Sequence, residues 1–145
     1  MTSDSSRRLG LPEWLITACG FWHIGLGLYF LLARPALLPE DIRYINSDAA
    51  LLLATVPKLA AWLDKVFAVM GGFMAGAGVL IVFIGIRVMP RNLPGSLVAL
   101  ALYGATTLVL MSAVNFALHS DFRWLLAIPP VAWFPAPALY YRKLA

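Results

Sequence analysis

Four long apolar stretches, separated by shorter polar segments, organise the chain. They cover approximately residues 12–33, 66–86, 95–118 and 124–141. Each is close to the roughly 20 residues that a helix needs to cross the hydrocarbon layer of a membrane. Because backbone N–H and C=O groups in lipid must be paired within the segment, each stretch is expected to be an α-helix. The pattern predicts an all-α integral membrane four-helix bundle, with residues 1–145 forming a single transmembrane domain.

The first stretch carries helix signals at both ends. Pro12 suits the first turn of a helix, and Glu13 complements the positive end of the helix dipole. Arg34-Pro35 ends the helix, since proline biases the residue before it away from helical angles. The stretch is longer than the apolar core of a signal peptide and lacks a small-residue cleavage motif after it. We therefore expect an uncleaved first helix.

An amphipathic interfacial helix is expected between the first two spans, over residues 39–64. Pro39 and the two acids that follow it are typical of a helix start. From Asp48 onward, apolar side chains share one helical face; these are Leu52, Val56, Leu59, Leu63 and Val66. Such a segment suits the membrane surface, with Pro57 as an interruption. It is expected to cap the bundle, and a substrate lid or a partner-docking surface are the alternatives.

Small residues concentrate in the second span. Gly72 and Gly76 lie four residues apart, as do Gly71 and Ala75. In lipid, this spacing lets two helix backbones approach closely and gain dispersion contacts. We expect the partner helix to belong to the same chain.

The fourth span is rich in proline. It contains Pro129, Pro130, Pro135 and Pro137. Each proline frees a carbonyl about one turn earlier, which a neighbouring helix, a side chain or water must satisfy. The fourth helix is therefore expected to be kinked, either to line a cavity or to fit its neighbours.

Composition agrees with a membrane protein. Hydrophobic residues make up 61% of the chain and charged residues 12%, against about half and about a quarter in soluble domains. The net charge of +4 does not indicate nucleic acid, because the basic residues stand singly or in pairs at the ends of apolar runs. The single cysteine excludes an intramolecular disulfide.

The basic residues also predict an orientation. One side of a four-span arrangement receives six of them: Arg7, Arg8, Arg87, Arg91, Arg142 and Lys143. Those on the other side are diluted over longer loops that also contain acids. Since Lys and Arg are concentrated in cytoplasmic segments, both termini are expected to be cytoplasmic, in a multi-pass protein of the bacterial inner (cell) membrane. Membrane lipids are its expected partners.

His23 is the leading candidate for chemistry. It lies near the middle of the first span, where an ionisable residue indicates a function by default. Cys19 and Gly27, four residues before and after it, share its helical face and leave room beside the imidazole. This pattern resembles that of bacterial light-harvesting polypeptides, in which the histidine ligates bacteriochlorophyll. The alternative is a packed, neutral histidine hydrogen-bonded to Thr106 or Thr107 at similar depth in the third span.

A second polar group lies near one membrane face. It consists of Asn115, His119, Asp121, Arg123 and, from the first connection, Arg34. An anion or a quinone headgroup is one candidate ligand, and capping of helix ends with contact to lipid headgroups is the alternative. His119 differs from His23 in depth by about 10 Å or more, so this pair is not expected to hold a haem. With no zinc spacing, phosphate-binding loop or catalytic triad in the sequence, we expect no metal site and no catalytic residues.

The run from Gly25 to Phe30 (Gly-Leu-Gly-Leu-Tyr-Phe), followed by Arg34-Pro35, resembles small DoxX-like four-helix membrane proteins of bacteria. The glycine-rich second span and the short connection between the third and fourth spans agree with this resemblance. It implies an accessory role linked to quinone-dependent oxidoreductases, and no functional residue carries over from it.

Three functions follow, in order of preference. The first is a non-enzymatic accessory or structural subunit of a larger membrane protein complex, or a binder of lipid-like molecules. The second is a redox or pigment-binding subunit in which His23 contacts a quinone or a porphyrin-type cofactor, such as a haem or a bacteriochlorophyll. A small transporter comes third, because the spans offer too few polar residues to line a continuous path.

Overall fold

The computed structural model describes residues 9–144 of the chain, and the side chains of residues 9–142. This part is all-helical and contains no strand. The α-helices are α1 (Leu11–Leu32), α2 (Pro39–Ile45), α3 (Ala49–Thr55), α4 (Leu59–Phe83), α5 (Ser96–Tyr103), α6 (Leu110–Ala117), α7 (Arg123–Trp133) and α8 (Pro135–Leu144). Three shorter helical segments complete it: the π-helices η1 (Ile84–Val88) and η3 (Gly104–Val109), and the 3₁₀-helix η2 (Met89–Arg91).

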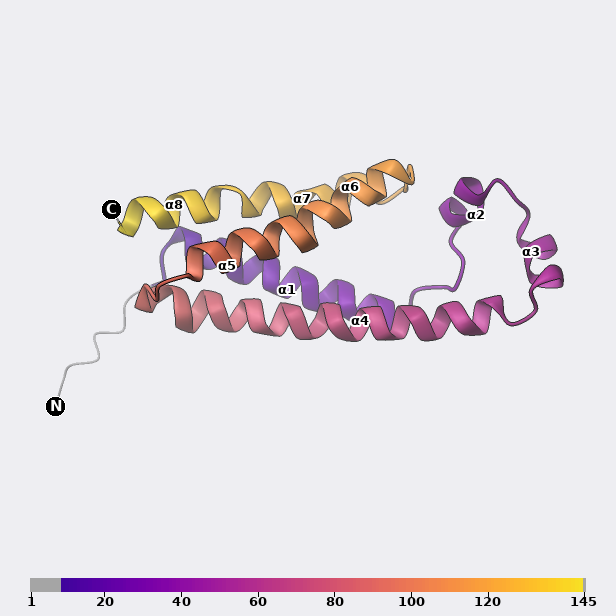
Figure 1. The fold of residues 1–145 in the computed structure, drawn as a ribbon, viewed down its shortest axis with the longest axis horizontal. Coiled ribbons are helices and arrows are strands. Elements are labelled where there is room, and N and C mark those ends of the chain that lie inside the picture. Colours follow the sequence, from indigo (N-terminus) through magenta and orange to yellow (C-terminus); the bar gives the residue numbers. More distant parts are fainter. Residues whose placement is uncertain (1–8, 145) are drawn as a thin grey trace.

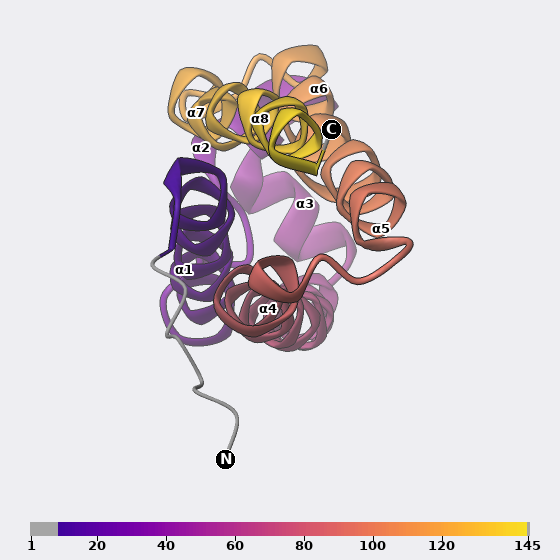
Figure 2. The same ribbon diagram turned by 90° about the vertical axis from the view of Figure 1, so that its left-hand side faces the viewer.

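The long helices lie side by side along the length of the molecule (Figure 1). Seen end-on, α1, α4, α5 and α8 surround a common interior (Figure 2). α5 continues through η3 into α6, and α7 is followed directly by α8. The short helices α2 and α3 lie at the end of the molecule opposite the start of α1; α2 lies beyond the end of α1, and α3 lies beyond the start of α4 (Figure 1).

Three helical segments of the described chain are long and apolar enough to cross a membrane. They are Leu11–Leu32, Leu59–Arg91 and Ser96–Ala117. The stretch expected to form a fourth span is divided at Phe134 into α7 and α8, of 11 and 10 residues. Pro135 begins α8, a position where the missing N–H of proline costs nothing. The proline-rich stretch is therefore a pair of short helices rather than one helix of membrane length.

Glycines bring α1 and α4 together, backbone against backbone. A Cβ on Gly78 would lie 2.7 Å from both Gly20 O and Ile24 N, and one on Gly71 would lie 2.6 Å from Gly27 O. The contacting glycines recur every seven residues in both partners: Gly20 and Gly27 in α1, and Gly71, Gly78 and Gly85 in α4 and η1. A seven-residue repeat keeps one seam of a helix facing its neighbour. Close approach of these two backbones therefore depends on the absence of side chains along the seam.

Gly72 and Gly76 do not take part in this contact. A Cβ on either glycine would meet nothing within 4 Å, so the expectation that this pair packs within the chain is wrong. The reason is helix geometry. Residues 71, 75 and 78 face α1, and each following residue of a helix is rotated by about 100° about its axis, so residues 72 and 76 point away from α1. The other expected pair, Gly71 and Ala75, does face α1 at Gly27.

The interior is apolar and the surface is also largely apolar. The buried core consists of Ile16, Cys19, Ile81, Met89, Leu100, Leu108, Trp133, Ala136 and Tyr140. Large apolar side chains elsewhere are open, with Phe73 77% and Val131 71% exposed. Contiguous apolar surface of this kind suits lipid better than water.

Candidate functional site

His23 lies midway along α1, on the face turned toward α7 and the interior. Its side chain is 3% exposed. One turn earlier, Cys19 is also buried, and its Sγ donates a long hydrogen bond to the carbonyl of Pro129 in α7, at 3.7 Å. The face of α1 that carries Cys19 and His23 thus looks into the bundle.

Gly27 serves a different purpose from the one suggested by the sequence. The backbone of α4 occupies the place of its missing side chain, with Gly71 O 2.7 Å from the position of a Cβ. Gly27 therefore makes room for a helix, and the space beside it is filled.

The threonines expected to bond to His23 bond to their own helix. Thr107 Oγ1 donates to Tyr103 O at 2.6 Å, and Thr106 Oγ1 donates to Leu102 O at 2.8 Å. His23 Nδ1 is buried and has no hydrogen-bond partner. The imidazole instead contacts the ring of Tyr103, with ring centroids 5.6 Å apart.

Tyr103 and Trp133 complete a group of three polar rings, which we call the ring cluster (His23, Tyr103 and Trp133). The Tyr103 ring lies 5.2 Å from that of Trp133, between centroids. Tyr103 Oη and Trp133 Nε1 are both buried without a hydrogen-bond partner, as is His23 Nδ1. An unsatisfied buried polar group costs about 1–3 kcal/mol, so three of them on rings that contact one another through Tyr103 mark a place that suits a polar guest.

The π-helix η3 begins beside this cluster. Its first residue, Gly104, faces the indole of Trp133, and a Cβ there would lie 2.6 Å from Trp133 Cδ1. Glycine at this position lets the indole lie against the backbone of η3. Single turns of π-helix occur often at functional sites, which agrees with the polar atoms gathered here.

An apolar groove on the outside of the molecule adjoins the ring cluster at Tyr103. It lies between α4 and α5 and has a volume of about 210 Å³. Its lining consists of Ala77, Leu80, Ile81, Ile84, Ala99, Leu100 and Tyr103. Tyr103 is thus both a wall of the groove and a member of the ring cluster. We call this the α4–α5 groove.

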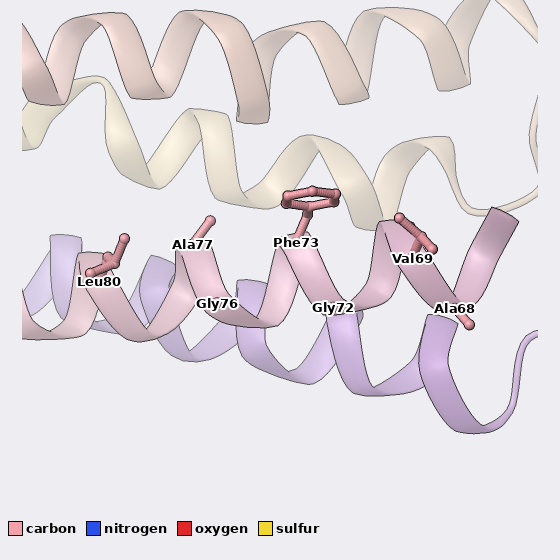
Figure 3. Close-up of a pocket in the computed structure, with 7 residues that line it drawn as sticks. All are labelled: Ala68, Val69, Gly72, Phe73, Gly76, Ala77 and Leu80. Atoms are coloured by element: carbon pink, nitrogen blue, oxygen red, sulfur yellow. The ribbon is translucent and has the colours of Figure 1, made fainter. Parts of the chain in front are cut away.

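A second, more open hollow extends the α4–α5 groove along α4. It has a volume of about 560 Å³ and shares Ala77 and Leu80 with the first. Its other lining residues are Ala68, Val69, Gly72, Phe73 and Gly76, and the close-up shows Phe73 and Ala77 pointing to the same side of α4 (Figure 3). The two glycines that α1 does not use therefore form part of this hollow.

The five polar residues that the sequence predicts at one membrane face make separate contacts. Arg34 pairs with Asp41 at 3.1 Å and lies over the ring of Phe67. Asp121 pairs with Arg43 at 2.7 Å. Asn115 donates to Met111 O in its own helix. His119 lies in the turn after α6 with a positive φ of 51°, and Arg123 is the first residue of α7. These bonds hold loops and helix ends and do not point to a shared ligand.

One buried contact near these residues is not apparent from the sequence. Ser120 Oγ donates to Glu40 Oε1 at 3.1 Å, and the two residues are 2% and 6% exposed. Together with the Arg43–Asp121 pair, it fastens α2 to the turn between α6 and α7. Eighty residues separate the partners, so no local pattern predicts the pairing.

Two further polar side chains are buried at the other end of the molecule. Tyr140 Oη in α8 donates to Met89 O at 2.9 Å. Glu13 in α1 is fully buried, whereas the sequence suggests only a helix-dipole role for it. Its position seven residues before Gly20 places it on the seam that faces η1. The seven-residue spacing is therefore the signal that locates Glu13.

Within residues 9–144, no three His, Cys, Asp or Glu side chains are grouped so as to hold a metal ion. Comparison of the chain with protein-family models, curated proteins and solved structures finds no match. The ring cluster and the α4–α5 groove therefore carry the functional argument on their own geometry.

Proposed function

We propose that this chain is a multi-pass membrane protein without enzymatic activity that binds a lipid-like molecule in the α4–α5 groove. The observation that supports it is the junction at Tyr103. On one side of this residue lies an apolar groove, and on the other lie buried polar atoms without partners. A molecule with an apolar chain and a polar head matches both environments.

The proposed setting is the bacterial inner membrane, with both termini cytoplasmic. Three helices of membrane length support the proposal that the protein lies in a membrane. The distribution of Lys and Arg supports the proposed orientation. In this setting α7 and α8 together form the fourth member of the bundle, alongside α1 and α5. A role as accessory subunit of a larger complex, and the DoxX-like resemblance, are compatible with this proposal and remain predictions.

A redox or pigment-binding role for His23 is the second candidate. The buried, unpartnered Nδ1 of His23 favours it. The filled space beside Gly27 speaks against a ring as large as a porphyrin on that face, so a quinone fits this candidate better. An absorption spectrum of the purified protein tests the pigment: a Soret or bacteriochlorophyll band that is lost in His23→Ala would favour it over simple lipid binding.

Lipid binding is tested by purifying the protein, extracting the lipids that remain bound to it, and identifying them by mass spectrometry. Ala77→Trp places an indole where the two parts of the groove meet, and we expect it to abolish retention. Ala101→Trp is the matched control, because Ala101 is exposed on α5 and does not line the groove. Equal retention by the wild type and both variants would show that lipid does not occupy this groove.

A further inference from the structure

The ring cluster lies where a charged guest is costly. His23 is midway along the 22-residue α1, so in the proposed membrane setting the cluster is near mid-membrane. The charged residues of the surrounding helices lie toward their ends: Glu13, Asp64, Lys65, Arg87, Arg123 and Arg142. A carboxylate or phosphate at the cluster would meet no cation and would bear the cost of charge at the centre of a bilayer.

The polar atoms of the cluster are suited to a hydrogen-bond acceptor. An indole N–H can only donate, and a phenol O–H donates readily; a neutral imidazole can present an N–H at either nitrogen. Of the three residues, Tyr103 is the one that also lines the groove, and its hydroxyl is buried within the cluster. A carbonyl oxygen has two lone pairs and carries no charge.

The apolar part of the site is long. Its two hollows follow α4 and the start of η1, from Ala68 to Ile84, a rise of about 24 Å. This is most of the hydrocarbon layer, which is about 30 Å thick. A single extended chain could lie along α4 over this length, in contact with the residues that line the two hollows.

From these observations we infer that the guest is a neutral long-chain lipid whose carbonyl oxygen accepts a hydrogen bond from the Tyr103 hydroxyl. This inference rests on the proposed function, because it specifies the chemistry of the molecule that the groove holds. The chain of the lipid lies along α4, and its carbonyl lies at the ring cluster.

Three probes of equal chain length separate the contributions of head and chain. They are heptadecyl methyl ketone, nonadecane and nonadecanoate, which are a neutral acceptor, a hydrocarbon and a charged acceptor. Each is equilibrated with the immobilised full-length protein in detergent, and the retained fraction is measured against protein-free micelles. We expect the ketone to bind about fivefold more tightly than nonadecane, the ratio that one net hydrogen bond of about 1 kcal/mol produces.

Tyr103→Phe removes the donor and keeps the ring. We expect it to lower the affinity for the ketone about fivefold and to leave that for nonadecane unchanged. With an isotope-labelled carbonyl, the infrared stretch of the bound ketone should lie at lower wavenumber in the wild type and return to its micelle value in the variant. Tyr141→Phe is the matched control, because Tyr141 is 60% exposed on α8.

The outcomes distinguish the two claims. Equal binding of ketone and nonadecane, unchanged in Tyr103→Phe, would overturn the carbonyl inference and leave lipid binding in place. Tighter binding of nonadecanoate than of the ketone would overturn the inference that the head of the lipid is uncharged. Retention of none of the three probes by the wild type would overturn the proposed function itself.

Discussion

The α1–α4 interface and the α5–α7 interface are built in opposite ways. Between α1 and α4, backbone lies against backbone, and the seam glycines leave no room for another atom. Between α7 and the junction of α5 with η3, which we call the α5–α7 interface, the contact is made by large rings: the indole of Trp133 lies against the ring of Tyr103 and the backbone of Gly104. The first interface is filled completely, whereas the second leaves polar atoms without partners.

This difference separates stability from binding within one small protein. In lipid, helices associate through close packing, since apolar side chains gain nothing by leaving an apolar solvent. The α1–α4 seam meets that requirement and provides a fixed wall. The other side, where the α4–α5 groove opens beside Tyr103, is then free to accept a guest. Mutations on the two sides should therefore have different consequences.

The largest effect is expected at the α1–α4 seam. In Gly78→Ala, the new Cβ would lie 2.7 Å from backbone atoms of Gly20 and Ile24, which cannot move independently of α1. We expect the free energy of unfolding to fall by about 3 kcal/mol, at the upper end of the range for overpacking. Unfolding by a denaturing detergent, followed by circular dichroism, measures the change.

Gly76→Ala is the matched control on the outer face of the same helix. A Cβ there meets nothing within 4 Å, and alanine is favoured over glycine in a helix by roughly 0.5–1 kcal/mol. We expect unchanged or slightly raised stability. Equal destabilisation by the two substitutions would mean that the seam and the outer face are not distinct.

A smaller effect is expected at Gly104. In Gly104→Ala, the new Cβ would lie 2.6 Å from Trp133 Cδ1, but a side chain can move away more easily than a backbone can. We expect the free energy of unfolding to fall by about 1–2 kcal/mol, and the same unfolding assay measures the change. The double variant with Trp133→Phe should recover part of it, because the two sites are in contact. Additive losses would contradict the proposed contact.

Tyr140→Phe is expected to lower the free energy of unfolding by about 1 kcal/mol. The substitution removes the hydrogen bond from Tyr140 Oη to Met89 O, which is buried and ties α8 to η2. Tyr141→Phe, on the exposed side of α8, should leave stability unchanged in the same assay. A loss in Tyr141→Phe as large as that in Tyr140→Phe would show that the bond to Met89 is not the cause.

Much of the fold follows from hydrophobic length alone, because crossing lipid requires about 20 apolar residues in a helix. The all-helical fold and helices of membrane length are both confirmed. The proline-rich stretch was harder to predict, since a proline can either kink a helix or begin a new one. Pro129 and Pro130 lie inside α7, whereas Pro135 begins α8.

The site was less accessible to sequence reasoning. His23 could be found because an ionisable residue stands out within an apolar run. Tyr103 and Trp133 do not stand out, and their proximity depends on how α5 and α7 pack, which no local pattern encodes. Choosing between the glycine pairs needed the seven-residue phase shared by Gly71, Gly78 and Gly85, which is visible in the sequence only when α1 is compared with α4.

The smallest effect is expected where α2 meets the turn between α6 and α7, outside both interfaces. Arg43 and Asp121 form a salt bridge at 2.7 Å, and their side chains are 55% and 59% exposed. An exposed pair contributes about 0–1 kcal/mol and is weakened by salt, so a double-mutant cycle of Arg43→Ala and Asp121→Ala should give a coupling below about 1 kcal/mol that falls at high salt. A coupling as large as the loss in Gly78→Ala would mean that polar contacts, rather than the glycine seam, hold this protein together.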